Sequence, residues 1–309
     1  MEVFLFLLLE RMGEMKIKNL FKEKKLVYSF EVFPPKEDLP LDRVFNTIER
    51  LSEIRPDYIS VTYGAGGSTL NNRTSILSSR IKNNQGIESL AHLTCIGATK
   101  KSIDGILKEL EENNVENILA LRGDMPEEGF IPREFKNSQD LISYIKTKGN
   151  FGIGAACYPE GHIETKVKDL DIDILGLKKE AGADYFISQL FFDNNLFYDF
   201  LNKVEKKGIR LPIQAGIMPV INKRQIERIV SMCGATLPQK FIRILNKYQH
   251  DSIALRDAGI AYATEQIVDL ITWGVEGIHL YTMNNTTIAN NITDNISSLI
   301  QSINSKKVI

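Results

Sequence analysis

The sequence predicts an α/β protein built as a single (β/α)8 barrel, the TIM-barrel fold. Two observations carry this prediction: eight short apolar runs occur along the 309 residues, and a segment with helical spacing follows each of them. Regular alternation of strands and helices is typical of right-handed βαβ units and a parallel sheet. Eight such units in roughly 280 residues suit a closed barrel. A doubly wound open sheet is the alternative that this pattern leaves open.

Each predicted strand is an apolar run, and most end at glycine, proline or a polar residue. The predicted strands cover residues 27–33, 58–63, 90–95, 117–121, 151–157, 185–191, 212–218 and 277–281. The predicted helices cover about 38–54, 70–82, 102–113, 139–146, 163–181, 194–206, shorter helices across 222–247, then 251–273 and 288–300. The late position of the last strand predicts extra helices before the eighth strand.

Composition and charge limit the classes of function. The chain is 43% hydrophobic and 25% charged, which is ordinary for a globular protein with a large core. A net charge of −1 gives no bulk attraction to nucleic acid or to an anionic membrane, so we expect neither as a partner. Cys95, Cys157 and Cys233 form no CxxC pair, which favours a reducing, cytoplasmic location. The sequence contains no zinc motif or P-loop, and no metal site is predicted.

The first residues need a separate interpretation. Residues 3–9 are an apolar run that is too short to span a membrane, and no small-residue cleavage site follows it. Met15 opens a more typical polar start. We therefore predict that residues 1–14 are an extension or a mis-called start and that 15–309 form the barrel. The intact mass of protein made from the natural gene would test this prediction.

The first predicted strand carries one carboxylate, Glu31, near its C-terminal end. Strand alternation places Glu31 on the same face as Val27 and Ser29, and Pro34 ends the strand shortly afterwards. A charge at the end of a buried strand is costly. Two interpretations are open: the carboxylate reaches solvent at the rim, or its pKa is raised and it serves as a proton donor.

Other polar residues follow the same rule of position. In a (β/α)8 barrel the active site lies at the C-terminal ends of the strands. Thr62, Arg122, Gly123, Asp124, Tyr158, Gln189 and Tyr281 lie at these ends, and His92 lies slightly earlier on the third strand. An Arg122–Asp124 ion pair or a satisfied core His92 would be a structural explanation for single members. The glycine-rich segment 64–67 is most simply a βα turn, although its amides could meet a phosphate. The whole set favours one active site at this rim.

Eight sequence blocks occur in a characteristic order. They are SFEVFPPK at 29–36, SVTYGAGG at 60–67, HLTC at 92–95, LALRGD at 119–124, YPEGH at 158–162, SQLFFD at 188–193, GIMPV at 216–220 and GIHLYT at 277–282. In this order the blocks resemble the methylenetetrahydrofolate reductases, over about residues 29–300. The chain is similar to the short bacterial form, which lacks the regulatory domain of the eukaryotic enzymes.

The resemblance implies an FAD-dependent barrel that reduces 5,10-methylenetetrahydrofolate to 5-methyltetrahydrofolate, with NADH or NADPH as electron donor. Glu31 matches the acid that protonates the folate, and Asp124 matches an aspartate near flavin and pterin that binds folate and tunes the flavin potential. Gln189, Lys223 and Tyr281 lie on the substrate side. The positions that match FAD contacts are Thr62, His92, Leu121, Arg122, Gly123, Asp124, Tyr158, His162, Asp171 and Lys178.

Asp171 and Lys178 are spaced by two helical turns and should share one helix face. On the resemblance, the carboxylate there could hold ribose hydroxyls and the ammonium could meet a phosphate. A solvated helix face is the alternative interpretation.

Two positions depart from the family pattern. Lys223 stands where the family often has an aromatic in the nicotinamide space, and Asn285 stands where it often has a basic residue near the folate tail. We hypothesise that Lys223 makes NADH a poor direct donor. We expect a homo-oligomer, and a partner subunit that transfers electrons is compatible with this hypothesis.

Two other classes of function are open. The chain could be a non-catalytic flavin- or folate-binding subunit of a reductase complex. A barrel lyase acting on phosphorylated substrates is disfavoured, because the sequence shows no evident Schiff-base lysine at a strand end.

Overall fold

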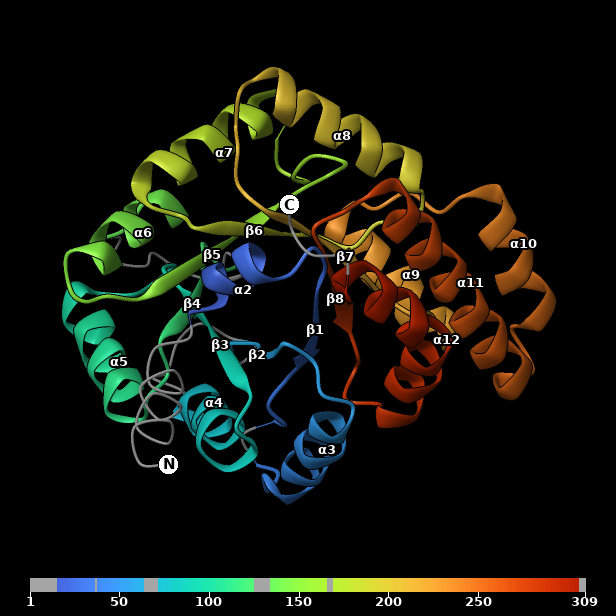
Figure 1. Cartoon of the computed structure of the whole chain (residues 1–309), viewed down its shortest axis with the longest axis horizontal. Coiled ribbons are helices and arrows are strands. Elements are labelled where there is room, and N and C mark those ends of the chain that lie inside the picture. The colour runs from blue at the N-terminus through green and yellow to red at the C-terminus, as the bar shows by residue number, and fades with distance from the viewer. Residues whose placement is uncertain (1–15, 37, 64–71, 125–133, 166–168, 306–309) are drawn as a thin grey trace.

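The computed structural model describes residues 16–36, 38–63, 72–124, 134–165 and 169–305. In this part of the chain, eight strands close a barrel in sequence order, and every neighbouring pair is parallel (Figure 1). The strands are β1 (Val27–Val32), β2 (Tyr58–Val61), β3 (Glu88–Thr94), β4 (Asn117–Leu121), β5 (Gly152–Cys157), β6 (Tyr185–Ser188), β7 (Ile213–Ile217) and β8 (Gly277–Tyr281). The (β/α)8 barrel is confirmed, and the open sheet is wrong because β1 pairs with β8.

Successive side chains along each strand point alternately to the barrel interior and to the core between the barrel and the helices, and both faces are buried. On β1, Tyr28, Phe30 and Val32 pack outward into the core between barrel and helices. Ser29 and Glu31 point into the barrel, where their side chains meet those of the neighbouring strands. Burial on both faces is typical of parallel sheets and explains why the strands are apolar runs.

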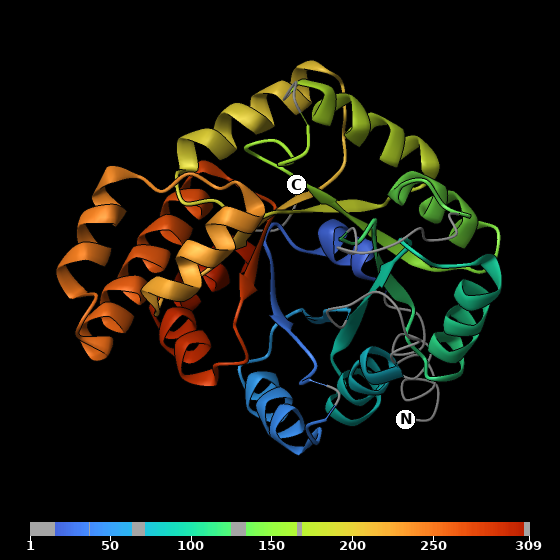
Figure 2. The same ribbon diagram turned by 180° about the vertical axis from the view of Figure 1, so that it is seen from behind.

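The helices form a ring around the barrel, as Figures 1 and 2 show from opposite sides. They are α3 (Asp42–Glu53), α4 (Asn72–Gln85), α5 (Lys100–Glu112), α6 (Ser138–Lys146), α7 (Asp169–Ala181), α8 (Asn194–Lys206), α9 (Lys223–Cys233), α10 (Gln239–Tyr248), α11 (Ser252–Trp273) and α12 (Thr286–Ser305). Three of them, α9 to α11, lie between β7 and β8, so the predicted extra helices are confirmed. Of the described helices, none has the length and apolarity to cross a membrane.

The start of α7 corrects the predicted helix 163–181. Residues 163–165 are not helical and α7 is described from Asp169, while its Asp171 carboxylate bonds to the loop that includes His162 and Thr165. Asp171 Oδ2 accepts from the backbone N–H of His162 at 2.7 Å, and Oδ1 accepts from the Thr165 hydroxyl at 3.0 Å. Side-chain bonds of this kind compete with helical backbone bonds.

A helix that the sequence analysis did not identify, α2 (Ile17–Glu23), closes one end of the barrel. Its Ile17 and Leu20 are buried against residues that begin strands, including Val27 and Tyr58. The backbone N–H of Ile17 donates to Asn117 Oδ1 at 2.9 Å. In Figure 1, α2 lies over the middle of the barrel, so the end opposite the strands' C-termini is plugged. Residues 1–14 and 64–67, on which predictions were made, lie outside the described residues.

Candidate active site

The C-terminal ends of the strands gather the predicted residues around one mouth. Leu121 and Tyr281 are the last residues of β4 and β8, and Glu31 and His92 lie one and two residues before the ends of β1 and β3. The residues that directly follow β2, β4, β5 and β6 are Thr62, Arg122, Gly123, Asp124, Tyr158 and Gln189. Within the described residues they fall into two clusters, one around Glu31 and one on the β4–β5 side.

Glu31 Oε2 is the centre of the first cluster. It lies 3.4 Å from Nε2 of His92 and 3.4 Å from Nε2 of His279, and it accepts from the Ser60 hydroxyl at 3.4 Å. The Glu31 side chain is 17% exposed, whereas His92 and His279 are buried. The carboxylate therefore combines buried polar neighbours with an opening to the mouth, and neither simple interpretation of its position is sufficient.

A chain of hydrogen bonds continues from Glu31 into the barrel. Ser29 Oγ lies 2.7 Å from Nδ1 of His279 and accepts from Nε2 of Gln214 at 3.1 Å. The hydroxyl of Tyr58 donates to Oε1 of Gln214. Ser29 Oγ also donates to the Ile278 carbonyl at 3.4 Å. The chain therefore runs from Glu31 through His279 and Ser29 to Gln214 and Tyr58.

The electrostatics of this cluster correct the expected pKa of Glu31. Burial raises the pKa of Glu31 and is the largest single influence, but the hydrogen bond from His279, the charges of His92 and His279 and the Ser60 hydroxyl together lower it below its ordinary value. Burial also lowers the pKa of His92 to about 4, so His92 is neutral at pH 7. In the unliganded protein Glu31 is therefore ionised, and the predicted raised pKa is wrong.

The second cluster lies on the loops after β4 and β5. The Arg122 guanidinium makes two parallel bonds to the Glu164 carboxylate, at 2.5 and 2.9 Å. The rings of Tyr158 and His162 meet edge to face with centroids 4.7 Å apart. Asp124 is exposed, and the alternative of a structural Arg122–Asp124 ion pair is wrong, because Arg122 pairs with Glu164.

Two side chains of helix α7, Asp171 and Lys178, contact the loop after β5 and the end of β5. Asp171 and Lys178 are both buried, which confirms that they share one face and rejects a solvated face. Lys178 Nζ donates to the Ala156 carbonyl at 2.6 Å and lies 5.6 Å from the centroid of the Tyr158 ring. Burial lowers the pKa of Lys178 to about 8. A buried ammonium with a single carbonyl acceptor retains two N–H donors that no described residue engages.

Tyr281 and Gln189 are fixed beside β6. The Tyr281 hydroxyl donates to the Ser188 carbonyl at 2.8 Å, and Gln189 Oε1 accepts from the backbone N–H of Leu190 at 2.9 Å. Gly216 on β7 makes room for this contact, because a Cβ there would lie 2.3 Å from the Ser188 oxygen and 2.8 Å from the Tyr281 hydroxyl.

The two positions that depart from the family pattern have structural roles. Lys223 Nζ bonds to Asn246 Oδ1 at 3.2 Å and to Gln249 Oε1 at 2.7 Å, so it joins the start of α9 to the end of α10. Asn285 Oδ1 accepts from the backbone N–H of Ile288 at 3.2 Å and caps α12. Within the described residues, neither side chain is seen to bond to another predicted site residue.

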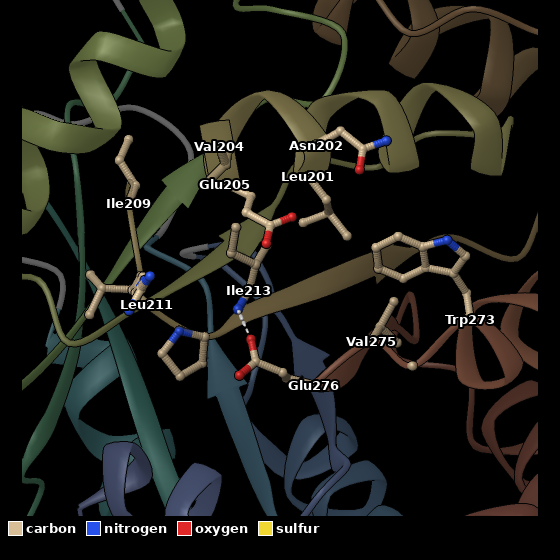
Figure 3. Close-up of a pocket in the computed structure, with 13 residues that line it drawn as sticks. Leu201, Asn202, Val204, Glu205, Ile209, Leu211, Ile213, Trp273, Val275 and Glu276 are labelled. Atoms are coloured by element: carbon tan, nitrogen blue, oxygen red, sulfur yellow. Dashed lines mark hydrogen bonds between the residues drawn. The ribbon is translucent and has the colours of Figure 1, made fainter. Parts of the chain in front are cut away.

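A pocket of about 460 Å³ lies at the other end of the barrel (Figure 3). It lies between the ends of α8 and α11 and the starts of β7 and β8. Figure 3 shows the Glu276 carboxylate accepting from the backbone N–H of Ile213, at 3.3 Å. Because Ile213 begins β7, this pocket is remote from the mouth that holds Glu31 and is no part of the candidate site.

Sequence reasoning gave no role to His279, Ser29, Ser60 or Gln214. The signal was present: His279 lies two residues before Tyr281 and therefore on the same strand face. Closure of the barrel then places β8 beside β1, with Ser29 opposite His279 in the register. Pattern analysis treats strands singly, so it identified Glu31 without the neighbours that control it.

Comparison with known proteins decides the family. The model of the family "Methylenetetrahydrofolate reductase" matches residues 16–297. The chain belongs to the methylenetetrahydrofolate reductase family. The 5,10-methylenetetrahydrofolate reductase of Escherichia coli K12 is 34% identical over 256 residues, which are 83% of this chain and 86% of that protein. The enzyme of Pectobacterium carotovorum is also 34% identical, over 84% of this chain and 87% of that protein.

Plant members of the family are longer. Methylenetetrahydrofolate reductase (NADH) 1 of Arabidopsis thaliana is 34% identical over 87% of this chain but only 48% of its own length. The chain thus spans about half of the plant relatives. Among solved structures, an uncharacterized protein of Clostridium thermocellum aligns over 94% of this chain and all of its own, with a TM-score of 0.59 and 15% identity. At this identity the likeness shows the fold alone.

Proposed function

We propose that this chain is an FAD-dependent 5,10-methylenetetrahydrofolate reductase that forms 5-methyltetrahydrofolate. Family membership and the names of the bacterial relatives support this reaction. The Clostridium thermocellum barrel binds 5-methyl-5,6,7,8-tetrahydrofolic acid, so a barrel of this form can hold a reduced folate. The observation that carries the proposal is Glu31, an ionisable carboxylate that opens to the mouth and is held by two histidines.

The donor set on the β4–β5 side fits FAD. Arg122 and Lys178 offer two cationic groups to a diphosphate. Outside this cluster, His92 Nε2 on β3 is buried, and its 3.4 Å approach to Glu31 Oε2 is not a hydrogen bond, so among the described residues it has no hydrogen-bond partner, as expected for a group that a ligand completes. FAD, when bound, would supply the hydride. The further residues proposed to hold it are Thr62, Leu121, Gly123, Asp124, Tyr158 and His162, with Asp171 fixing the His162 loop.

Glu31 would supply the proton of the reaction. Reduction of the methylene group needs a hydride on its carbon and a proton on the nitrogen that leaves this carbon. Because Glu31 is ionised in the free protein, it must take up a proton when the folate arrives. A pterin ring covering the carboxylate would exclude water and raise the pKa of Glu31. His279 and Ser60 would hold Oε2 in position, while Gln189, Tyr281 and Asp124 would bound the folate.

The electron donor is the open part of the proposal. The names of the plant relatives specify NADH, which supports a nicotinamide donor. Lys223 bonds to Asn246 and Gln249 and offers no aromatic face for a nicotinamide ring to stack on. The second candidate function therefore retains the folate chemistry but takes electrons from a partner protein. Anaerobic titration of the flavin protein with NADH distinguishes the two candidates.

The Glu31→Gln variant tests the proposed chemistry. We expect it to bind FAD and to be reduced by dithionite like the wild type, because the FAD-holding cluster lies on other strands. Reoxidation of its reduced flavin by methylenetetrahydrofolate should be slowed at least about 100-fold, since a general acid contributes about that much. Stopped-flow absorbance of the flavin gives this rate.

A matched control separates the acid from a general loss of charge. Glu276→Gln removes a carboxylate at the opposite end of the barrel and should leave the folate rate unchanged. Normal folate reduction by Glu31→Gln would remove Glu31 from the mechanism. A wild-type protein that binds no flavin would refute the proposal as a whole.

A further inference from the structure

Glu164 forms an ion pair with Arg122 at the mouth of the barrel. This pairing engages a guanidinium that could otherwise bind an anionic ligand. Arg122 follows β4, and Glu164 lies on the loop after β5. Their two parallel bonds, at 2.5 and 2.9 Å, match the geometry in which a guanidinium binds a phosphate. The Glu164 carboxylate raises the pKa of Arg122 mainly through these bonds, so the pair is fully charged at neutral pH.

The two partners are anchored differently. Arg122 is about 30% exposed and its Nε also donates to the Gly123 carbonyl at 3.2 Å. Glu164 is 53% exposed, and no bond from its carboxylate is seen to any described residue except Arg122. The arginine is therefore fixed at the site, whereas the carboxylate can swing into solvent without breaking other contacts.

We propose that Glu164 is an internal competitor that occupies Arg122 in the free protein and is displaced by the diphosphate of the cofactor. This inference rests on the proposed function, because it takes FAD as the ligand. It assigns to Glu164 a role opposite to that of a binding residue: its charge weakens cofactor binding. The exchange also keeps Arg122 paired at every stage, since one anion replaces another.

The sign of the effect distinguishes this inference from a supporting role. If Glu164 only oriented Arg122, its removal would weaken FAD binding. If it competes, Glu164→Gln should bind FAD about fivefold more tightly, the size expected for loss of a partly exposed ion pair. The gain should appear with ADP, which carries the diphosphate, and be absent with riboflavin, which carries no phosphate.

The test is a titration of the apoprotein, following quenching of flavin fluorescence for FAD and riboflavin and heat for ADP. The matched control is Glu265→Gln, which removes a comparable two-bond surface carboxylate from Lys240 on α10. We expect Glu265→Gln to bind all three ligands like the wild type. Raising the salt to about 1 M should reduce the gain in Glu164→Gln, because the competition is electrostatic.

The outcomes are separable. Equal or weaker FAD binding by Glu164→Gln overturns the inference, and so does a gain of the same size with riboflavin. Wild-type protein that binds neither FAD nor ADP overturns the proposed function and the inference together. Tight FAD binding by the wild type without a gain in the variant overturns the inference alone.

Discussion

At the residue scale, the environment of Glu31 explains more than its position does. Its place on β1 follows from strand alternation and is visible in the sequence. Its ionisation does not follow from the sequence, because His92 and His279 come from strands far away in the chain. Burial alone would raise the pKa of Glu31, and the two histidines together with the Ser60 hydroxyl lower it below its ordinary value. If Glu31 is the proton donor, it must take up its proton when the substrate binds, so proton transfer depends on substrate binding.

His279 is the neighbour whose removal should alter this balance most. His279→Leu deletes the hydrogen bond that is the largest influence lowering the pKa of Glu31. The pKa of Glu31 should therefore rise, and the protonated form should persist to higher pH. We expect the alkaline limb of the rate of folate reduction by pre-reduced flavin to move upward by about one pH unit. Single-turnover rates between pH 6 and 9 measure this shift.

Tyr58→Phe is the control for the His279 variant. It removes the hydroxyl at the far end of the same hydrogen-bond chain, beyond Ser29 and Gln214, and keeps the ring that stacks on His279 with centroids 6.0 Å apart. Its pH profile should coincide with that of the wild type. If the two variants moved the profile equally, the effect would come from general loosening of the barrel interior.

At the element scale, the strands were predictable and some helix boundaries were not. All eight strands lie within or close to the predicted ranges, because apolar runs buried on both faces give a strong signal. The predicted helix 163–181 begins too early, since residues 163–165 are not helical: the Asp171 carboxylate binds His162 and Thr165, a local bond that hydrophobic spacing does not report. Helix α2 was not predicted because seven residues show barely two turns of periodicity.

Helix α2 should contribute stability without taking part in the chemistry. Leu20 is buried among the strand starts, so Leu20→Ala should lower the free energy of unfolding by about 2–4 kcal/mol. The candidate mouth lies at the opposite end, so FAD affinity should be unchanged at 25 °C. Urea unfolding followed by circular dichroism measures the loss. Leu170→Ala, on the exposed face of α7, is the control and should cost less than about 1 kcal/mol.

Lys223, which joins α9 to the end of α10, allows a test of whether NADH is the direct electron donor. Lys223→Phe places an aromatic at the first residue of α9 and breaks the bonds to Asn246 and Gln249. If the lysine limits nicotinamide stacking, the variant should reduce its flavin with NADH about tenfold faster in the stopped flow. Gln249→Ala breaks one of the same bonds without adding a ring. An equal gain in Gln249→Ala would attribute the effect to a loosened contact.

At the scale of the whole molecule, barrel closure accounts for the part of the site that the sequence could not supply. Individual strands could be predicted, as could the rule that their C-terminal ends meet. The pairing of β1 with β8 brings Glu31 to His279, and the adjacent β4 and β5 loops bring Arg122 to Glu164. These contacts join residues 248 and 42 positions apart. Their geometry depends on the complete fold and is not encoded in any local pattern.

The buried Lys178 of the proposed cofactor site should lower the free energy of unfolding of the protein. Burial lowers the pKa of Lys178 from 10.5 to about 8, so between these values the unfolded chain binds more protons than the folded one. Below pH 8 the buried charge of Lys178 lowers the free energy of unfolding by its full amount, roughly 3 kcal/mol. This loss of stability decreases as the pH rises from 8 to 10.5. The proposed binding of the FAD diphosphate by Lys178 would explain why the fold keeps a lysine at this cost.

Lys178→Met should accordingly stabilise the apoprotein and weaken FAD binding. Removing the buried charge gains more than the single bond to the Ala156 carbonyl loses, so we expect Tm to rise by about 3 °C at pH 7. At pH 9.5 the difference should shrink by more than half, because the wild-type lysine is then largely neutral in the folded state. Lys179→Met, on the exposed side of α7, should change neither Tm nor FAD affinity. A variant that is destabilised at pH 7 but binds FAD normally would show that Lys178 serves packing alone, since only a cofactor role links higher stability to weaker binding.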